Sequence, residues 1–288
     1  MEDFNSPPRS SWQIPDGVSP GTWDYVRTRS IASEYGEFLK HDPLTQLDWQ
    51  IVCRWLPEVK SGERSPKVIE FGCGNGRTLI PLLERGYQCL GVDLSMPMLQ
   101  EMEKRFHESS AYPRNRLTSI QANLVQLECL QQDSIDHAVC LFSTLGMIRH
   151  ERYRRQFLEH ARRIICPDGK FILHAHNVWS QLRDRGGLQW FAKHLVEVSR
   201  KKNEFGDRFS EYRGIRNMFI HSFRKRELIQ LLEGSGFSVQ EVYPVTRALL
   251  DQIESCNNGG DDSKIDEAIE RSRNAGMFQA IGWIIVCK

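Results

Sequence analysis

The sequence lacks any long hydrophobic run, and this absence limits what the chain can be. No apolar stretch approaches the roughly 20 residues that a membrane-spanning helix needs, so we expect no membrane association. The first residues also lack a basic stretch followed by an apolar core. We therefore expect no signal peptide and a cytoplasmic protein.

An excess of charge of one sign is also missing. Lys and Arg number 38 against 37 Asp and Glu, so the formal net charge is +1. That balance provides no electrostatic argument for a nucleic-acid partner. The eight cysteines include no C-x-x-C pair, which argues against a zinc site, and we predict no metal. Several of them lie in apolar, strand-like runs and are expected to be buried free thiols. No internal repeat is present, and the sequence indicates no particular oligomeric state.

What the chain does contain is a regular alternation of short apolar strands and longer helical patterns. This alternation predicts an α/β fold: a doubly wound, mostly parallel seven-stranded sheet of the Rossmann-like kind, with helices on both faces. The expected strands comprise residues 67–71, 87–93, 117–123, 134–143, 171–176, 237–245 and 276–288.

Around this core, the sequence predicts three further regions. Residues 1–20 are rich in Pro, Ser and Gly, which predicts a flexible arm. Residues 21–288 are expected to form a single domain. Residues 22–56 show helical spacing and predict two helices separated near Asp42-Pro43. Residues 177–220, after the fifth strand, are longer than a simple crossover requires and predict a helical, lid-like insertion. A helix that only caps the sheet is the alternative for that insertion.

The stretch "KVIEFGCGNGRTL", residues 67–79, carries the clearest motif. Gly72, Gly74 and Gly76 follow the first strand and precede a helix. Glycine allows a backbone turn that a ligand can approach closely. A purely structural turn and a dinucleotide site are alternatives, but the dinucleotide pattern G-x-G-x-x-G needs its third glycine where this chain has Arg77.

Polar residues at the ends of neighbouring strands accompany these glycines. Glu70 precedes the turn, Asp93 ends the second strand and Asn123 ends the third. Phe142 and Ser143 end the fourth strand. Because parallel strands present their carboxyl ends at one edge of the sheet, we expect these side chains to converge on one crevice. A carboxylate at the position of Asp93 is suited to accept hydrogen bonds from two ribose hydroxyls.

The segment from Lys67 to Asn177 resembles the class I S-adenosylmethionine-dependent methyltransferases, above all in "IEFGCGNG". The resemblance implies S-adenosyl-L-methionine as the cofactor, with Glu70 near its ammonium end, Asp93 at the ribose and Asn123 at the adenine. Many members of that family have Asp where this chain has Asn123. The cofactor-binding residues that the resemblance implies are Glu70, Gly72, Cys73, Gly74, Asn75, Gly76, Asp93, Leu94, Met98, Asn123, Leu124, Phe142 and Ser143.

Histidines provide the candidates on the side of the methyl acceptor. His176 and Asn177 follow one another at the carboxyl rim of the fifth strand, where active sites form, and His221 precedes a late helix. We take these three as catalytic or substrate-contacting candidates, while His174 is expected to be hydrogen-bonded within the sheet. In the insertion, Trp190 and Phe191 offer an apolar face that could cover an acceptor.

The sequence thus predicts a methyltransferase that acts on a small-molecule acceptor. One alternative is methylation of transfer RNA, because "MFIHSFRKRELIQLLEGSGF" loosely resembles a segment of wobble-uridine methyltransferases. Another is a non-catalytic module that binds S-adenosylmethionine. The identity of the acceptor is not encoded in the shared core.

Overall fold

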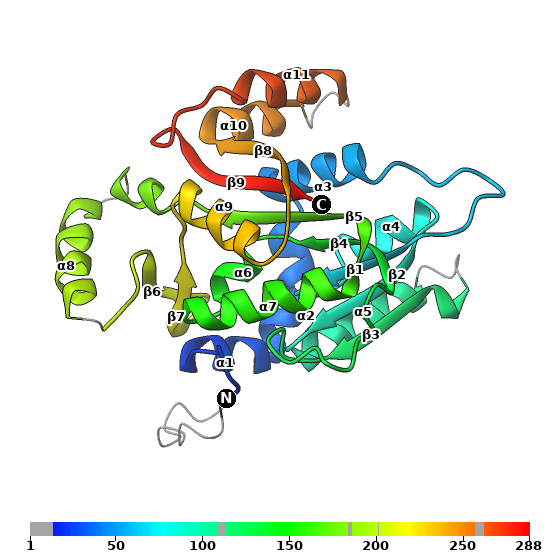
Figure 1. Cartoon of the computed structure of the whole chain (residues 1–288), viewed down its shortest axis with the longest axis horizontal. Coiled ribbons are helices and arrows are strands. Elements are labelled where there is room, and N and C mark those ends of the chain that lie inside the picture. Colours follow the sequence, from blue (N-terminus) through cyan, green and yellow to red (C-terminus); the bar gives the residue numbers. More distant parts are fainter. Residues whose placement is uncertain (1–13, 109–112, 184–185, 201, 257–261) are drawn as a thin grey trace.

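The structure, a computed structural model, describes residues 14–108, 113–183, 186–200, 202–256 and 262–288 (Figure 1). Most of the predicted N-terminal arm lies outside these residues, and the first helix, α1, begins at Pro20. Among the described residues, no helix combines the length and the apolar character needed to cross a membrane.

A seven-stranded sheet forms the centre of the molecule, as predicted. Its strand order is β3-β2-β1-β4-β5-β9-β8; the first five of these run parallel, and β9 runs antiparallel to both of its neighbours, β5 and β8. The strands are β1 (Lys67–Phe71), β2 (Gln88–Asp93), β3 (Leu117–Gln121), β4 (Ile135–Cys140), β5 (Ile165–His176), β8 (Val239–Thr246) and β9 (Ala280–Cys287).

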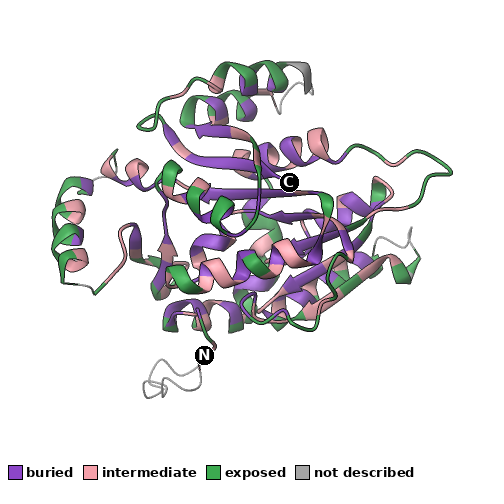
Figure 2. Cartoon of the chain, in the orientation of Figure 1, coloured by how far each residue is buried: buried purple, intermediate pink, exposed green. Residues whose placement is uncertain are grey.

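Helices cover both faces of this sheet, and the strands lie buried between them (Figure 2). One face packs against α7 (Glu151–Ile164) and α9 (Lys225–Gly234). The other packs against α3 (Pro43–Trp55), α4 (Leu79–Glu84), α5 (Met96–Glu108), α10 (Arg247–Cys256) and α11 (Asp262–Ser272).

Side chains of each strand alternate between these two faces. In β1, Ile69 and Phe71 belong to the core beneath α7 and α9, whereas Val68 belongs to the core beneath α3 and α4. Glu70 therefore points to the same face as Val68. In β5, the same alternation places His174 and His176 on the α3 side of the sheet, with Ile172.

The strand order reverses direction between β1 and β4. From β1 the chain proceeds outward to β2 and β3, and then returns to β4 and β5 on the other side. The connections after β1 and β4 therefore leave the sheet in opposite directions and open a crevice at the carboxyl ends of these strands. Ligands bind at this position in open α/β sheets.

The N-terminal region contains three helices where the sequence predicted two. They are α1 (Pro20–Arg27), α2 (Arg29–Leu39) and α3, and the predicted separation at Asp42-Pro43 is present. The side chains of Ser19 and Asp42 accept backbone N–H groups at the starts of α1 and α3, each followed by proline in the first turn. The additional break follows Arg27, where Thr28 adopts an extended conformation.

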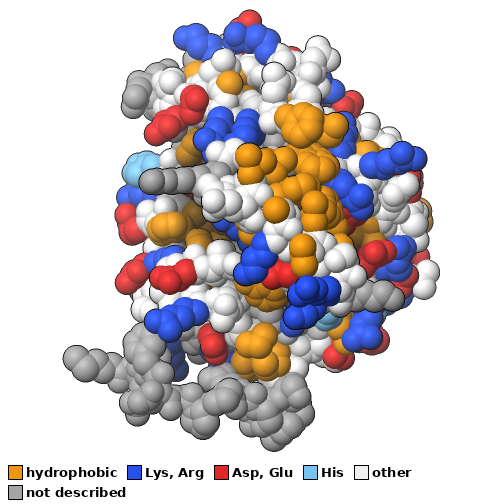
Figure 3. Space-filling view, turned by 90° about the vertical axis from the view of Figure 1, so that its left-hand side faces the viewer, with side chains coloured by type: hydrophobic (Ala, Val, Ile, Leu, Met, Phe, Trp, Pro, Cys, Tyr) orange, Lys and Arg blue, Asp and Glu red, His pale blue; other side chains and the backbone are white. Residues whose placement is uncertain are grey.

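The insertion after β5 is only partly helical. It contains a 3-10 segment, η3 (Val178–Arg183), the helix α8 (Gly187–Ser199), and an antiparallel hairpin of β6 (Asp207–Tyr212) and β7 (Ile215–His221) that the sequence analysis did not predict. Figure 3 shows the face of the molecule that carries α8, where hydrophobic side chains gather. The exposed apolar residues of α8 are Leu188, Leu195 and Val196.

Candidate functional site

A cavity of about 650 Å³ occupies the crevice at the carboxyl ends of the strands. One wall, which we call the cavity floor, is formed by the carboxyl ends of β1 to β5 and by the turns that follow them. We call the opposite wall the cavity cover: the segment from Gly17 through α2, together with the β6–β7 hairpin. α1 packs directly on β7, so the two parts of the cover support each other.

Most of the residues predicted to bind a cofactor meet in this cavity. All but Gly76 and Ser143 line it. Gly76 lies behind the turn, against the side chain of Met102. The hydroxyl of Ser143 accepts the backbone N–H of His176 at 3.2 Å, which ties the end of β4 to the end of β5.

Asp93 holds the glycine-rich turn in place. Its Oδ2 accepts the N–H of Gly74 at 2.8 Å, and its Oδ1 accepts the N–H of Ser95 at 2.8 Å. Burial raises the pKa of Asp93, and these two N–H groups oppose that rise. Each carboxylate oxygen keeps a further lone pair. Asp93 can therefore accept hydroxyl groups from a ligand while it fixes the turn.

Glu70 is the second carboxyl group at this edge of the sheet, and its situation differs. The side chain is only 4% exposed, and its Oε2 has no hydrogen-bond partner within the described part of the chain. Burial raises the pKa of Glu70 to about 8. A buried carboxyl oxygen without a partner is costly unless a ligand supplies one, and an ammonium group would suit it.

The glycines show where a ligand has room. All three have positive φ, but a Cβ on Gly72 would collide with Thr144. A Cβ on Gly74 would meet only Tyr35, at 3.8 Å, so the space above Gly74 belongs to the cavity. The residues present therefore fit S-adenosylmethionine: an open backbone turn, a carboxylate for hydroxyls and an unpartnered carboxyl for a cation.

The turn after β4 is strained. Phe142 and Ser143 are consecutive non-glycine residues with φ of 52° and 61°. Such conformations cost on the order of 1–3 kcal/mol each and cluster at ligand-binding positions. The strain lies where the sequence resemblance places the transferred methyl group.

Asn123 joins the floor to the cover. Its Nδ2 donates to the carbonyl oxygen of Asp16 at 2.9 Å, in the segment before α1. The same Asp16 accepts the hydroxyl of Tyr153, from α7, on its carboxylate at 2.7 Å. The apolar side chains of Met98 and Leu124 are buried nearby and line the cavity.

His176 lines the cavity, as predicted for an acceptor-side residue, and so does His174. Burial, with a smaller effect of His174, lowers the pKa of His176 to about 3, so its ring is neutral at pH 7. The ring centroids of the two histidines lie 5.4 Å apart. Behind them, the fully buried carboxylate of Asp48 lies 3.5 Å from Nδ1 of His174 and 3.9 Å from Nη2 of Arg77.

The structure does not bring Asn177 or His221 into the cavity. Asn177 is buried; its Nδ2 donates to the carbonyl oxygens of Met277 and Ala280 at 2.6 and 2.8 Å, and its Oδ1 accepts the N–H of Trp179. A side chain so fully bonded to the backbone anchors the chain where it leaves β5.

His221 sits between two carboxylates, with Nδ1 2.8 Å from Asp207 and Nε2 3.0 Å from Glu227. This arrangement fixes the hairpin to α9. Glu204, Asp207 and His221 also form a group with metal-ligand atoms within 4.8 Å of one another. The Arg154 guanidinium donates to Glu204 at 2.5 Å and so supplies the positive charge beside this group.

The rings of Trp190 and Phe191 also lie away from the cavity. The ring of Trp190 stacks on that of His194, with the ring centroids 4.8 Å apart, and Phe191 packs against Trp179 and Phe205. They form the apolar interior of the insertion, whose part in the cavity cover is the hairpin.

Asp48, behind the cavity, was missed from the sequence, although it is an acidic residue on the buried face of α3. Two further sets of residues line the cavity. Tyr25 could be assigned from the sequence equally well to a cover over the cofactor or to ordinary packing, and Tyr35 was assigned no role. The hairpin residues Arg208, Ser210 and Tyr212 share one face of β6, but their period-2 pattern was not recognised as a strand.

Comparisons with known proteins agree with this geometry. Residues 68–169 match the sequence model of the family described as "Methyltransferase domain". A Bacillus subtilis (strain 168) protein, YqeM, named as a candidate methyltransferase, is 24% identical over 149 residues, which are 52% of this chain. The match spans 55%, about half, of that relative's own length.

Among solved structures, the CcbJ methyltransferase of Streptomyces caelestis superimposes with a TM-score of 0.59 at 17% identity, over 91% of this chain and 98% of that one. The 1,6-didemethyltoxoflavin-N1-methyltransferase of Burkholderia thailandensis, solved with 1,6-didemethyltoxoflavin and S-adenosylhomocysteine, superimposes with a TM-score of 0.54 at 16% identity. That match covers 94% of this chain and 90% of the other.

Residues 68–169 thus resemble the methyltransferase domain family, and the chain as a whole has the fold of the class I S-adenosylmethionine-dependent methyltransferases. The family model and these solved structures support S-adenosylmethionine as the cofactor.

Proposed function

We propose that this protein transfers a methyl group from S-adenosylmethionine to a small-molecule acceptor held between the cavity floor and the hairpin. One observation carries the proposal: a single cavity contains both the residues suited to the cofactor and the neutral ring of His176. The Burkholderia thailandensis structure, which contains 1,6-didemethyltoxoflavin and S-adenosylhomocysteine, supports a small acceptor. The balanced net charge gives no support to transfer RNA as the methyl acceptor.

The cofactor, when bound, would supply an electrophilic methyl group on a sulfonium. Asp93 would accept hydrogen bonds from its ribose hydroxyls, and Glu70 would face its ammonium group. The open backbone at Gly74 gives the room for this approach. The chain's task is then chiefly to align the acceptor atom with the methyl group, since orientation alone provides much of the acceleration in displacements of this kind.

His176 is the residue best placed to orient the acceptor. A general base works best when its pKa lies near the working pH, and the pKa of His176 is about 3. We therefore assign it the role of a hydrogen-bond acceptor for an O–H or N–H group, which turns the lone pair of the acceptor atom toward the methyl group. His174, beside Asp48, supports the ring from behind.

Ligand-induced thermal stabilisation tests the cofactor part of the proposal. A ligand that binds only the folded state at 100 times its Kd adds about 2.7 kcal/mol of stability. S-adenosylhomocysteine should therefore raise Tm by roughly 5 °C or more, whereas NAD should leave it unchanged. Transfer of label from methyl-labelled S-adenosylmethionine to a library of small molecules then tests the acceptor class. Stabilisation by NAD alone, or label found only on transfer RNA, would contradict the proposal.

A further inference from the structure

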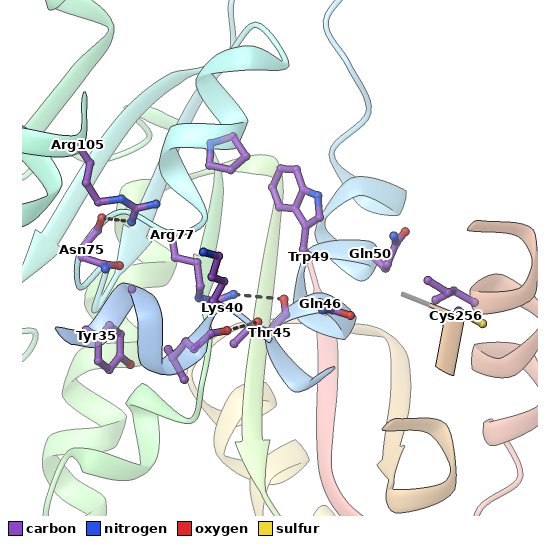
Figure 4. A pocket seen from close by; sticks show the side chains of 14 residues that line it. Tyr35, Lys40, Thr45, Gln46, Trp49, Gln50, Asn75, Arg77, Arg105 and Cys256 are labelled. Atoms are coloured by element: carbon purple, nitrogen blue, oxygen red, sulfur yellow. Dashed lines mark hydrogen bonds between the residues drawn. The ribbon is translucent and has the colours of Figure 1, made fainter. Parts of the chain in front are cut away.

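A second cavity, of about 440 Å³, lies behind the cofactor cavity (Figure 4). The two cavities share three wall residues, Tyr35, Asn75 and Arg77. The second cavity is otherwise enclosed by α2 and α3 on one side, by α4 and α5 on another, and by single residues of α10 and α11. Of the residues assigned to the cofactor or the acceptor above, only Asn75 also lines this second cavity.

This second cavity is strongly asymmetric in charge. Lys40, Arg77 and Arg105 line it, and the described residues around it include no Asp or Glu. The chain as a whole is balanced, with 38 basic and 37 acidic residues, so this excess of positive charge is local. Lys40 has an exposed partner, Glu37, at 3.5 Å, so the two guanidinium groups carry the argument.

Both guanidinium groups donate hydrogen bonds to backbone carbonyl oxygens. Arg105 donates to the carbonyl oxygen of Asn75 at 2.8 Å, and Arg77 donates to that of Thr45 at 3.2 Å. Nη2 of Arg77 also lies 3.9 Å from the carboxylate of Asp48, which does not line this cavity. For Arg105, no carboxylate within the described ranges forms an ion pair. Burial and the nearby charge of Arg77 lower the pKa of Arg105, although Glu101 and Glu108 oppose this shift. An anion between the two arginines would relieve their repulsion.

The rest of the lining suits a flat ring with polar edges. Trp49 projects from α3, across the cavity from Arg105 (Figure 4). The Oε1 of Gln46 is buried without a hydrogen-bond partner in the described part of the molecule, so it can accept an N–H or O–H group. Paired guanidinium groups bind phosphate well, and an aromatic face stacks on planar bases. The volume also lies within the range of small-molecule sites.

We propose that this second cavity binds a phosphate-bearing planar ligand of the nucleotide class, at the same time as the cofactor cavity holds its own ligand. The phosphate would lie between Arg77 and Arg105, and the ring would lie against Trp49. Because Arg105 also holds the carbonyl of Asn75 in the glycine-rich turn, occupancy of the second cavity should change the affinity of the cofactor cavity, and the effect must be reciprocal.

Calorimetry on the full chain with adenosine monophosphate as the probe tests this inference. Saturating S-adenosylhomocysteine is present throughout, so that the cofactor cavity is closed to the probe. We expect one saturable site, weakened at least tenfold by Arg105→Gln and less than twofold by Lys104→Gln. Lys104 is the neighbouring cation on α5; it pairs with Glu101 and does not line the cavity. Adenosine without phosphate should bind at least tenfold more weakly.

Two further variants and probes complete the test. Trp49→Ala should weaken the binding of adenosine monophosphate but not that of inorganic phosphate, and thermal unfolding of each variant shows whether it is folded. A probe that binds the ligand-free protein but shows no saturable binding in the presence of S-adenosylhomocysteine would be entering the cofactor cavity, and the inference would fail. Equal affinity for inorganic phosphate and adenosine monophosphate, or equal effects of the two α5 variants, would also overturn it.

Discussion

The cavity floor and the cavity cover are built in different ways. The floor comes from residues 70–143 and from the end of β5, where each side chain follows directly from the strand before it. The cover combines the segment from Gly17 through α2 with the β6–β7 hairpin, which are separated by well over a hundred residues in the sequence. α1 packs on β7 only once the chain has folded.

We propose that this difference separates recognition of the cofactor from recognition of the acceptor. The floor carries the features that S-adenosylmethionine needs, and their order along the strands is fixed by the parallel sheet. The cover contributes Tyr25, Arg208 and Tyr212, which no shared motif specifies. Substitution of Asp93 at the end of β2 should therefore change cofactor affinity, whereas substitution of His176 at the end of β5 should change turnover.

Asp93→Ala should produce the largest effect. Two charge-assisted hydrogen bonds from ribose hydroxyls contribute roughly 1.5–3 kcal/mol each, so the affinity for S-adenosylhomocysteine should fall at least about 100-fold. The variant also deprives the N–H groups of Gly74 and Ser95 of their acceptor, so the free energy of unfolding should fall by about 1–3 kcal/mol.

Asp136→Ala is the matched control for that substitution. Asp136 likewise accepts a backbone N–H, from Lys67 at 2.7 Å, but it lies at the opposite end of the sheet. Asp136→Ala should lower the free energy of unfolding without changing the affinity for S-adenosylhomocysteine. If Asp93→Ala binds S-adenosylhomocysteine as tightly as the wild type by calorimetry, the ribose is held elsewhere.

His176→Ala should have the next largest effect, and on turnover alone. Loss of the group that orients the acceptor should lower kcat/KM about 100-fold, while the Kd for S-adenosylhomocysteine changes less than about twofold. The assay uses the acceptor found in the labelling screen. His137→Ala, a half-buried histidine at the start of β4 and outside the cavity, should change neither quantity. Parallel losses of affinity and turnover in His176→Ala would place the ring on the cofactor side.

The buried carboxyl group of Glu70 should make the stability of the ligand-free protein depend on pH. The pKa of its carboxyl is about 8 in the folded protein against an ordinary value of 4.5. Between about pH 5 and pH 8, the unfolded chain is ionised at this residue while the folded chain keeps its proton. The folded state thus binds more protons, and stability should fall as the pH rises, by up to about 1.4 kcal/mol per pH unit.

Glu70→Gln should remove this pH dependence. Urea unfolding of the ligand-free protein at several values between pH 5 and pH 8 measures the slope. Above about pH 8 the wild-type curve should level off, because both states are then ionised. A wild-type slope that persists unchanged in Glu70→Gln would assign the titration to another group. S-adenosylhomocysteine should also reduce the slope if its ammonium group faces Glu70.

The contrast between the cavity floor and the cavity cover also explains which parts of the structure could be predicted from the sequence. The seven strands and the convergence of Glu70, Asp93 and Asn123 follow from local hydrophobic patterns and from the geometry of a parallel sheet. The hairpin was not predicted, because the period-2 pattern of β6 was not recognised as a strand. His221 looked like an active-site residue because the sequence does not reveal that Asp207 and Glu227 enclose it. Asp48 became significant only when α3 placed it behind His174.

Asn123→Asp should give the smallest effect, and it tests the join between floor and cover. The carboxylate cannot donate to the carbonyl oxygen of Asp16, so one exposed hydrogen bond, worth about 0.5–1.5 kcal/mol, is lost. The new side chain can still accept from an adenine amino group. The Kd for S-adenosylhomocysteine should therefore rise less than about threefold, whereas limited proteolysis ahead of α1 should become severalfold faster. Gln121→Glu is the matched control, because its amide donates to Leu94 and not to the cover. If the two variants are cleaved at the same rate, Asn123 does not hold the cover to the floor.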